Sequence, residues 1–384
     1  MNIGIDIRNI GKGRTGDEVV FFNLVKNLAL IDSKNSYQLF TDILDQEILI
    51  KIKKSLGMEN KSNFEIISLK TKNKFSWNFW TLPNYLQKNP LDIYLTQYIT
   101  PFFISRKVKI ITIIHDVSFR VFPRMIKLSD LFFLRILIPL AIWRSDRVIG
   151  VSRFTRDEII KYYHIKPGKA DYIYNAVSID FLQKKYSEKE AEEIRKKYHL
   201  PKKFILYLGT MQPRKNIPIL IEAYAKIKKK LPEMSLVLAG GKKHNYDLNI
   251  DRKIQKYTFT NADVLFTGFI LEEDKKALIG MADCFCFPSL YEGFGIPILE
   301  AFSCKTPCVV SGIPPHFEIA KDAALFFIPY DAQNLAEKIF QVLTKSDLRE
   351  ELIRKGEEQV LFFSWQKTTK KMLRILEEVF RNAQ

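Results

Sequence analysis

Two glutamates stand on either side of a Gly-Phe-Gly turn in the stretch PSLYEGFGIPILEAF (288–302). Glu292 comes before the turn, and Glu300 would lie about one turn into a helix that Pro297 can begin. A carboxylate accepts two hydrogen bonds side by side, which suits two neighbouring hydroxyls such as those of a ribose. The spacing therefore predicts that the two carboxylates hold two different sugars of one ligand. The alternative is a glycine turn followed by a glutamate that the helix macrodipole favours.

A pair of cations stands at a second turn, in LGTMQPRKN (208–216). Arg214 and Lys215 follow an apolar run and precede an amphipathic helix, for which Asn216 is a plausible N-cap. Two fixed cations beside the N–H groups of a helix start would bind a diphosphate without a metal ion. The alternative is a solvated basic turn, because charge runs usually face water.

Two segments of the first half carry further candidates. His115 and Asp116 end the apolar run KIITIIHD (109–116), at an edge expected to face a cleft. A histidine at a strand end is more often structural than catalytic, so both interpretations stay open. The loop RNIGKGRTGDEVV (8–20) carries several glycines, but they do not form the G-x-G-x-x-G fingerprint of dinucleotide binding.

Short apolar runs alternate with helical segments and must position these residues. Most runs are near-continuous in Ile, Val, Leu and Phe, which is typical of strands buried on both faces of a parallel sheet. The predicted strands form two series: 2–7, 37–40, 64–69, 93–96, 109–116 and 147–152, then 204–210, 235–241, 264–269, 283–288, 307–312 and 324–329. The pattern predicts an α/β fold of two doubly wound, Rossmann-like domains.

A charged stretch between the two series, 184–203, marks the domain boundary. We expect a first domain over 1–185 and a second over 186–363, because 384 residues exceed what one core usually supports. Ligands of such domains bind at the carboxyl ends of the strands, here in the cleft between domains. The last helical pattern, 364–384, has no strand after it.

Composition narrows the class of protein. Hydrophobic residues make up 47% of the chain, which excludes a disordered protein, and the net charge of +17 favours anionic partners. Basic residues are spread along both halves without a recognisable nucleic-acid module, so no nucleic acid is expected. The cysteines are interpreted as buried small hydrophobes in a reducing cytoplasm rather than zinc ligands: Cys284, Cys286, Cys304 and Cys308.

The most apolar segment, LFFLRILIPLAIW (131–143), is too short to span a bilayer, and the N-terminal stretch lacks the features of a secretory signal. We interpret the segment first as a helix buried in a core. The alternative is an interfacial helix on an anionic membrane surface, because basic residues flank or interrupt it. These residues are Arg124, Lys127, Arg135, Arg144 and Arg147.

Five motifs together resemble the retaining glycosyltransferases of family 4, which have the GT-B fold. They are YEGFGIPILEAF, LGTMQPRKN, IITIIHDVSF, VSRFTRDEI and NAVSIDFL. The match spans nearly the whole chain in the family's order, from Thr15–Gly16 to FSW at 363–365. The spacing of Glu292 and Glu300 is its most specific part.

The resemblance implies a role for each residue. The second glutamate would hold the nucleotide ribose, the first would contact the transferred sugar, and the histidine would approach that sugar from the opposite domain. The final helix would cross back onto the first domain. The implied site comprises His115 and Glu292 as catalytic residues, Arg214, Lys215 and Gly16 for the donor diphosphate, and Gly293, Phe294, Gly295 and Glu300 for the donor sugar and nucleotide, with no metal.

The chain departs from the family pattern in two places. Many relatives carry an arginine where this chain has Thr210, so Arg214 would have to serve beside Lys215. The first loop reads TGDEV, and its Asp17 and Glu18 put acid where a phosphate would approach Gly16.

We therefore expect a retaining glycosyltransferase that moves a hexose from a GDP- or UDP-linked sugar to a glycan or lipid-linked glycan. It would need no cofactor and no metal, and would work in the cytoplasm, peripherally on the inner face of the membrane. The alternatives are a nucleotide-sugar epimerase, a phosphorylase-like enzyme and a nucleic-acid-binding protein.

Overall fold

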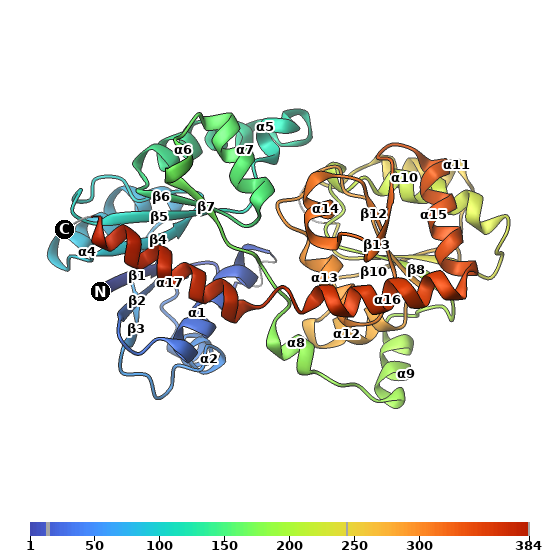
Figure 1. The fold of residues 1–384 in the computed structure, drawn as a ribbon, viewed down its shortest axis with the longest axis horizontal. Coiled ribbons are helices and arrows are strands. Elements are labelled where there is room, and N and C mark those ends of the chain that lie inside the picture. Colours follow the sequence, from blue (N-terminus) through green and yellow to red (C-terminus); the bar gives the residue numbers. More distant parts are fainter. Residues whose placement is uncertain (13–15, 243–244, 383–384) are drawn as a thin grey trace. The chain divides into compact units, whose positions relative to one another are not determined.

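The structure, a computed structural model, describes residues 1–12, 16–242 and 245–382. It divides into two compact units, both visible in Figure 1. Unit 1 comprises residues 1–120, 128–175 and the segment from 364 onward, and unit 2 comprises residues 121–127 and 176–363.

Unit 1 is built on a parallel sheet in the order β3-β2-β1-β4-β5-β6-β7. Its strands are β1 (Asn2–Asp6), β2 (Ser36–Thr41), β3 (Phe64–Ser68), β4 (Ile93–Gln97), β5 (Lys109–Ile114), β6 (Arg147–Gly150) and β7 (Ala170–Tyr172). The apolar runs form strands because helices cover both faces of the sheet, and β5 is buried from Ile110 to Ile114. The order reverses between β1 and β4, which makes their carboxyl ends the expected ligand edge.

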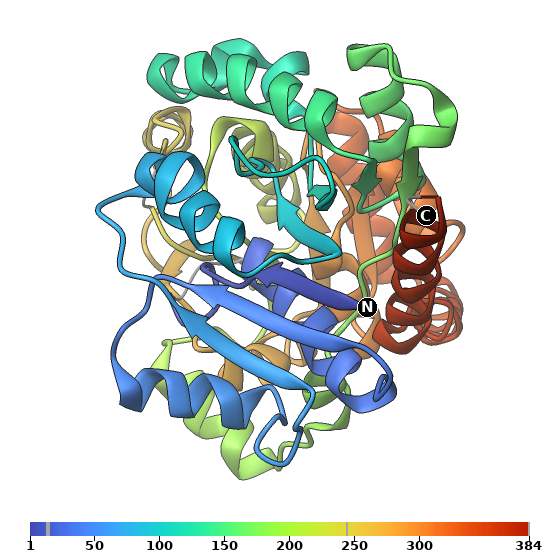
Figure 2. The same ribbon diagram turned by 90° about the vertical axis from the view of Figure 1, so that its left-hand side faces the viewer.

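The helices of unit 1 include the last helix of the chain. They are α1 (Asp17–Ile31), α2 (Gln46–Ser55), α3 (Lys74–Ser76), the π-helix η1 (Trp77–Thr81), α4 (Leu82–Lys88), α5 (Ser118–Val121), α6 (Leu128–Arg144), α7 (Arg153–Tyr163), η3 (Pro167–Lys169) and α17 (Trp365–Arg381). Helix α17 packs against α1 (Figure 2), and Lys371 Nζ lies 2.9 Å from Asp171 Oδ1. The return of the final helix to the first unit is confirmed.

Unit 2 holds a second parallel sheet, in the order β10-β9-β8-β11-β12-β13. Its strands are β8 (Phe204–Leu208), β9 (Ser235–Ala239), β10 (Val264–Gly268), β11 (Cys284–Phe287), β12 (Cys308–Ser311) and β13 (Ala324–Phe327). Its helices are η2 (Pro123–Met125), α8 (Ile179–Gln183), α9 (Glu188–Lys197), η4 (Pro213–Lys215), α10 (Ile217–Lys228), α11 (Asn249–Lys256), α12 (Glu272–Gly280), α13 (Ile296–Ser303), α14 (Pro314–Ala320), α15 (Ala332–Thr344) and α16 (Ser346–Val360). The strand order reverses between β8 and β11.

Every predicted strand is present, and the α/β fold with two doubly wound units is confirmed. Strand β7 was not predicted, because three residues are too few to show a pattern. The longer segment of unit 2 begins at Ala176, before the sequence-based boundary at 185. Helix α8 explains the difference, because Lys276 Nζ on α12 donates to the carbonyl oxygens of Phe181 and Leu182, at 2.8 and 2.7 Å.

Helix α6 differs from the core helix that was our first interpretation of 131–143. It buries Leu131, Ile138, Ala141 and Ile142. The opposite side exposes Phe132, Phe133, Ile136, Leu140 and Trp143. Within the described residues, none of the helices has both the length and the apolar character that crossing a bilayer requires.

Candidate functional site

The basic turn of unit 2 follows the carboxyl end of β8. Arg214 and Lys215 lie in the 3-10 turn η4, and the Lys215 side chain is buried. Asn216 occupies the N-cap position of α10 in a left-handed conformation, with φ of 54°. The predicted N-cap position is confirmed, although the Asn216 side chain makes no capping hydrogen bond. A buried lysine is not a solvated surface charge, and it must have an anionic partner.

Glu292 is that partner. Lys215 Nζ lies 2.5 Å from Glu292 Oε1, and Arg214 Nη1 lies 3.3 Å from Glu292 Oε2. Arg214 Nη1 also donates to the Tyr291 carbonyl oxygen at 3.1 Å. The backbone N–H of Leu290 donates to the Arg214 carbonyl oxygen at 2.8 Å. Because β8 and β11 are neighbours in the sheet, two loops that are distant in sequence form one site.

The electrostatics of Glu292 follow from this pairing. Burial raises its pKa, but the charges of Lys215 and Arg214 outweigh burial and lower the pKa to about 2. The carboxylate is therefore ionised at neutral pH. The same two cations that the sequence assigns to a diphosphate are held by Glu292 in the structure.

The Gly-Phe-Gly turn lies between Glu292 and helix α13. Gly295 has φ of 118°, a value that L side chains rarely adopt, and a Cβ added there would lie 3.2 Å from Ile298 Cδ1. Phe294 is buried, with its ring centroid 5.6 Å from that of Phe363. The Phe294 ring therefore packs in the interior of unit 2.

Glu300 lies on α13 and is also buried. Its Oε1 is 2.5 Å from Lys275 Nζ on α12, whereas Oε2 has no hydrogen-bond partner among the described residues. Burial raises the pKa of Glu300, and Lys275 opposes that rise only in part. Each carboxylate thus pairs with a lysine, but the pKa of Glu292, which has two cations beside it, is lowered and that of Glu300 is raised.

His316 on α14 is a residue of this site that sequence reasoning missed. It is fully buried, and Nδ1 lies 2.9 Å from the Ser311 carbonyl oxygen, so Nδ1–H donates and Nε2 is the acceptor. Nε2 has no partner among the described residues. Burial lowers the pKa of His316 to about 4, against the opposing charge of Glu292. Nothing in its apolar surroundings in the sequence distinguishes it from a core residue.

The predicted residues of unit 1 lie beside one another at the carboxyl ends of β4 and β5. His115 Nε2 is 2.8 Å from Gln97 Oε1 and 3.9 Å from Asp17 Oδ1 at the start of α1. Gly16 is the N-cap residue of α1, with φ of 80°. Thr15, the other residue of that motif, lies outside the described residues. Asp116 instead accepts hydrogen bonds from Ser118, which suits a structural role at the start of α5.

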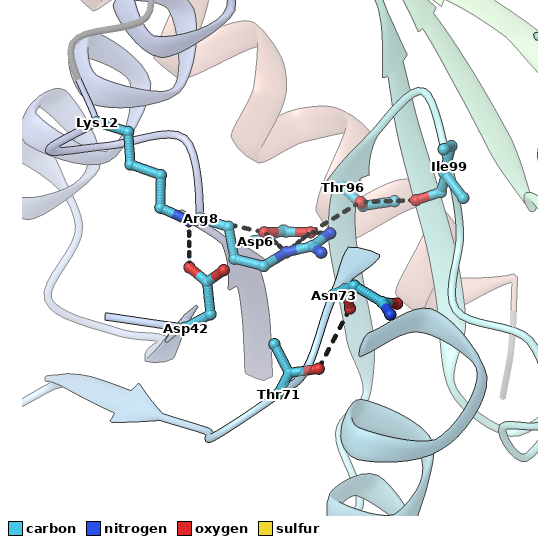
Figure 3. A network of polar contacts seen from close by, with 8 residues as sticks. All are labelled: Asp6, Arg8, Lys12, Asp42, Thr71, Asn73, Thr96 and Ile99. Atoms are coloured by element: carbon cyan, nitrogen blue, oxygen red, sulfur yellow. Dashed lines mark hydrogen bonds and ion pairs between the residues drawn. The ribbon is translucent and has the colours of Figure 1, made fainter. Parts of the chain in front are cut away.

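A polar network that the sequence did not reveal lies where the strand order of unit 1 reverses (Figure 3). Arg8 donates to the buried Asp6 through Nε at 2.9 Å and Nη2 at 2.6 Å, and its guanidinium lies 4.5 Å from the Trp77 ring centroid. Lys12 pairs with Asp42 at 2.5 Å. Arg8 and Lys12, the cations in the described part of the first loop, are therefore each paired with a carboxylate.

Three of the four cysteines pack as buried small apolar residues, as the sequence predicted, whereas Cys304 is only partly buried. Cys284, Cys286 and Cys308 are fully buried in strands β11 and β12. Burial raises the pKa of the Cys284 thiol to about 12, so it is protonated at neutral pH. Across the described residues, no group of three His, Cys, Asp or Glu side chains is arranged to hold a metal ion.

Two protein families match consecutive parts of the chain. Residues 57–181 match the family described as Glycosyltransferase Family 4, and residues 190–359 match the family described as Glycosyl transferases group 1.

Two similar proteins from Escherichia coli are named mannosyltransferases. The chain is 33% identical over 226 residues to the serotype-specific mannosyltransferase WbdA of Escherichia coli, covering 59% of this chain and 28% of that protein. It is 30% identical over 266 residues to O-antigen chain mannosyltransferase B of Escherichia coli, covering 69% of each. The chain thus spans little more than a quarter of the length of WbdA but two thirds of the second relative.

Solved structures share the fold over the whole chain. Sucrose-phosphate synthase from Thermosynechococcus elongatus aligns with a TM-score of 0.76 at 19% identity, covering all of both chains. Anabaena Alr3699/HepE in complex with UDP and glucose aligns with a TM-score of 0.74 at 17% identity, covering 98% of this chain and all of that one.

Proposed function

The chain belongs to the glycosyltransferases of group 1 and family 4, and we propose that it is a retaining hexosyltransferase. The donor is a GDP- or UDP-linked hexose, and the acceptor is a hydroxyl of a glycan or lipid-linked glycan. Mannose is the first candidate for the hexose, because both Escherichia coli relatives are named mannosyltransferases.

One observation carries this proposal: two cations and two carboxylates gather in unit 2 beside the strand-order reversal. Arg214 and Lys215 follow β8, and Glu292 and Glu300 follow β11, its neighbour in the sheet. Ligands of doubly wound folds bind outside the carboxyl ends of strands at such a reversal. The residue types suit a ligand with a diphosphate between two sugars.

The proposed chemistry asks the protein for positioning and charge stabilisation. The bond between the sugar's anomeric carbon and the diphosphate breaks, and the acceptor oxygen bonds to that carbon from the same face. The departing phosphate oxygen takes the proton of the acceptor hydroxyl. Arg214 and Lys215 stabilise the negative charge that develops on the diphosphate, and Glu292 orients the sugar hydroxyls. His115 in unit 1 remains a predicted contact to the sugar.

A panel of GDP- and UDP-linked hexoses, scored by thermal unfolding, tests the donor assignment. A ligand present at 100 times its Kd should raise the free energy of unfolding by about 2.7 kcal/mol. The best donor is then incubated with a glycan acceptor in excess chelator, and the anomeric proton of the product is observed by NMR. We expect an α-linked product from an α-linked donor. No stabilisation by any member of the panel, or a β-linked product, would contradict the proposal.

The exposed apolar face of α6 suggests how the protein reaches its acceptor. We propose that this face binds the surface of an anionic bilayer that carries the acceptor. The rings of Phe75 and Phe133 are 5.3 Å apart, so the apolar face of α6 continues onto α3. The exposed cations Arg106, Lys107 and Arg135 complement anionic lipid. An apolar face bordered by basic residues is typical of interfacial helices.

Vesicle flotation at low salt should recover the protein with anionic vesicles, and added salt should reduce the bound fraction. Phe132→Ser should weaken binding on the order of 10-fold, because an aromatic side chain no longer leaves water. Phe269→Ser in unit 2 is a matched control, since Phe132 is 63% exposed and Phe269 is 64% exposed. Wild-type protein that does not float at low salt, or equal losses in both variants, would rule out this surface.

A further inference from the structure

Lys275 is a charged residue of unit 2 to which the proposed chemistry gives no role. It lies on α12, and its side chain is only 19% exposed although the sequence around it, LEEDKKAL, suggests a solvated face. Its Nζ is 2.5 Å from Glu300 Oε1 and 3.7 Å from Glu272 Oε1. Ordering a lysine in a largely buried position costs side-chain entropy and desolvation, which only a well-formed ion pair offsets.

The two oxygens of Glu300 differ in their surroundings. Lys275 donates to Oε1, whereas the buried Oε2 has no hydrogen-bond partner in the described part of the chain. A buried acceptor without a donor is destabilising, because it has lost its hydrogen bonds to water. A hydroxyl of a ligand would satisfy Oε2, while the lysine prevents the carboxylate from rotating away.

The groups that face Glu300 explain why a cation is needed there. Burial raises the pKa of Glu300, Glu272 on α12 raises it further, and Lys275 is the cation that lowers it. The nearby thiol of Cys304 is protonated, since burial raises its pKa to about 12. Lys276 points elsewhere, because its Nζ donates to the carbonyl oxygens of Phe181 and Leu182.

We propose that Lys275 is a positioning residue for the nucleotide: it fixes one oxygen of Glu300 so that the other accepts from the paired ribose hydroxyls. The inference rests on the proposed function, which assigns Glu300 to the ribose. It adds that the lysine opposes the rise in the pKa of Glu300 that burial causes, and so favours the ionised carboxylate over the protonated one.

Calorimetry of Lys275→Met with bare UDP and bare GDP between pH 6 and 8.5 tests this inference. Without the lysine the pKa of Glu300 rises further, and a protonated carboxyl has lost an acceptor site. The variant should bind about tenfold more weakly than wild type at the alkaline end, and the deficit should grow as pH falls. Because the terminal phosphate of the ligand also titrates near pH 6, the quantity compared is the ratio of the two Kd values at each pH.

Lys276→Met is the matched control, since it removes the same charge from the next residue of α12 and should leave the ratio at one across the pH range. A deficit in Lys275→Met that does not change with pH would indicate a merely structural lysine and overturn the inference. If Lys275→Met does not fold, Glu300→Gln provides the test. The inference predicts that Glu300→Gln binds the nucleotide more weakly than wild type, by a factor that does not change with pH. Wild-type affinity in this variant would overturn the inference.

Failure of this inference and failure of the proposed function are distinguishable. Unchanged affinity in Glu300→Ala would remove Glu300 from the nucleotide site, and with it the proposed ribose contact. Weakened affinity in Glu300→Ala together with a wild-type pH profile in Lys275→Met would overturn the role of Lys275 alone.

Discussion

Replacing Glu292 with glutamine should lower turnover on the order of 100-fold or more while the affinity for a bare nucleoside diphosphate is kept or increased. The structure gives the reason for this separation. The carboxylate pairs with Lys215 and Arg214, so it would compete with a diphosphate for the two cations that we propose bind it. The neutral amide removes that competition, and it also removes the charged acceptor proposed to orient the sugar.

Steady-state kinetics with the nucleotide sugar and calorimetry with the nucleoside diphosphate measure the two effects separately. Glu222→Gln is a suitable control, because Glu222 pairs with Lys253 between α10 and α11, away from the turn. That pair is partly exposed, so its loss should change neither quantity by more than a few-fold. Equal losses of turnover and nucleotide affinity in Glu292→Gln would show that Glu292 contacts the nucleotide or only supports the fold.

The strands and the two turns of the candidate site could be predicted because their signals are local. A near-continuous apolar run predicts a strand that is buried on both faces, and β5 and β11 are such strands in the structure. Gly295 and Pro297 mark the start of α13 for reasons of backbone geometry alone. Glu292 and Glu300 therefore lie where their spacing placed them.

The partners of the charged residues could not be predicted, because they depend on packing between distant elements. Lys215 and Glu292 are 77 residues apart in the sequence, and Lys275 and Glu300 are 25 apart. Each lysine belongs to a basic run that would equally suit a solvated surface. Burial decides between the two interpretations, and burial follows from the sheet order, which no short motif encodes.

Helix α6 is an element whose exposure could not be predicted from its sequence. Its composition is apolar nearly all round, and such a pattern normally predicts a buried helix. The structure buries one side and leaves Phe132 and Trp143 exposed. Composition alone cannot distinguish a helix that is buried on all sides from a helix that buries one apolar side and exposes the other.

The largest combined effect is expected for Lys215→Met, which should lower turnover on the order of 1,000-fold and destabilise unit 2 by about 3–5 kcal/mol. The stability loss arises because Glu292 stays buried with only Arg214 to balance its charge. The pKa of Glu292 would then rise, since Lys215 is the largest of the charges that lower it. The turnover loss arises because the departing diphosphate loses its most buried cation.

Combining Lys215→Met with Glu292→Gln separates these two effects. Removing both charges leaves no uncompensated buried ion, so the double variant should recover most of the stability that Lys215→Met loses. It should not recover turnover, because neither the sugar contact nor the cation returns. Thermal unfolding measures the stability, and steady-state kinetics the turnover, of wild type, the two single variants and the double variant. Lys253→Met is the control for removing a partly exposed lysine. If the double variant is as unstable as Lys215→Met, the two charges do not stabilise the fold as a pair. If the turnover of Lys215→Met stays within about tenfold of wild type, Lys215 does not stabilise the leaving group.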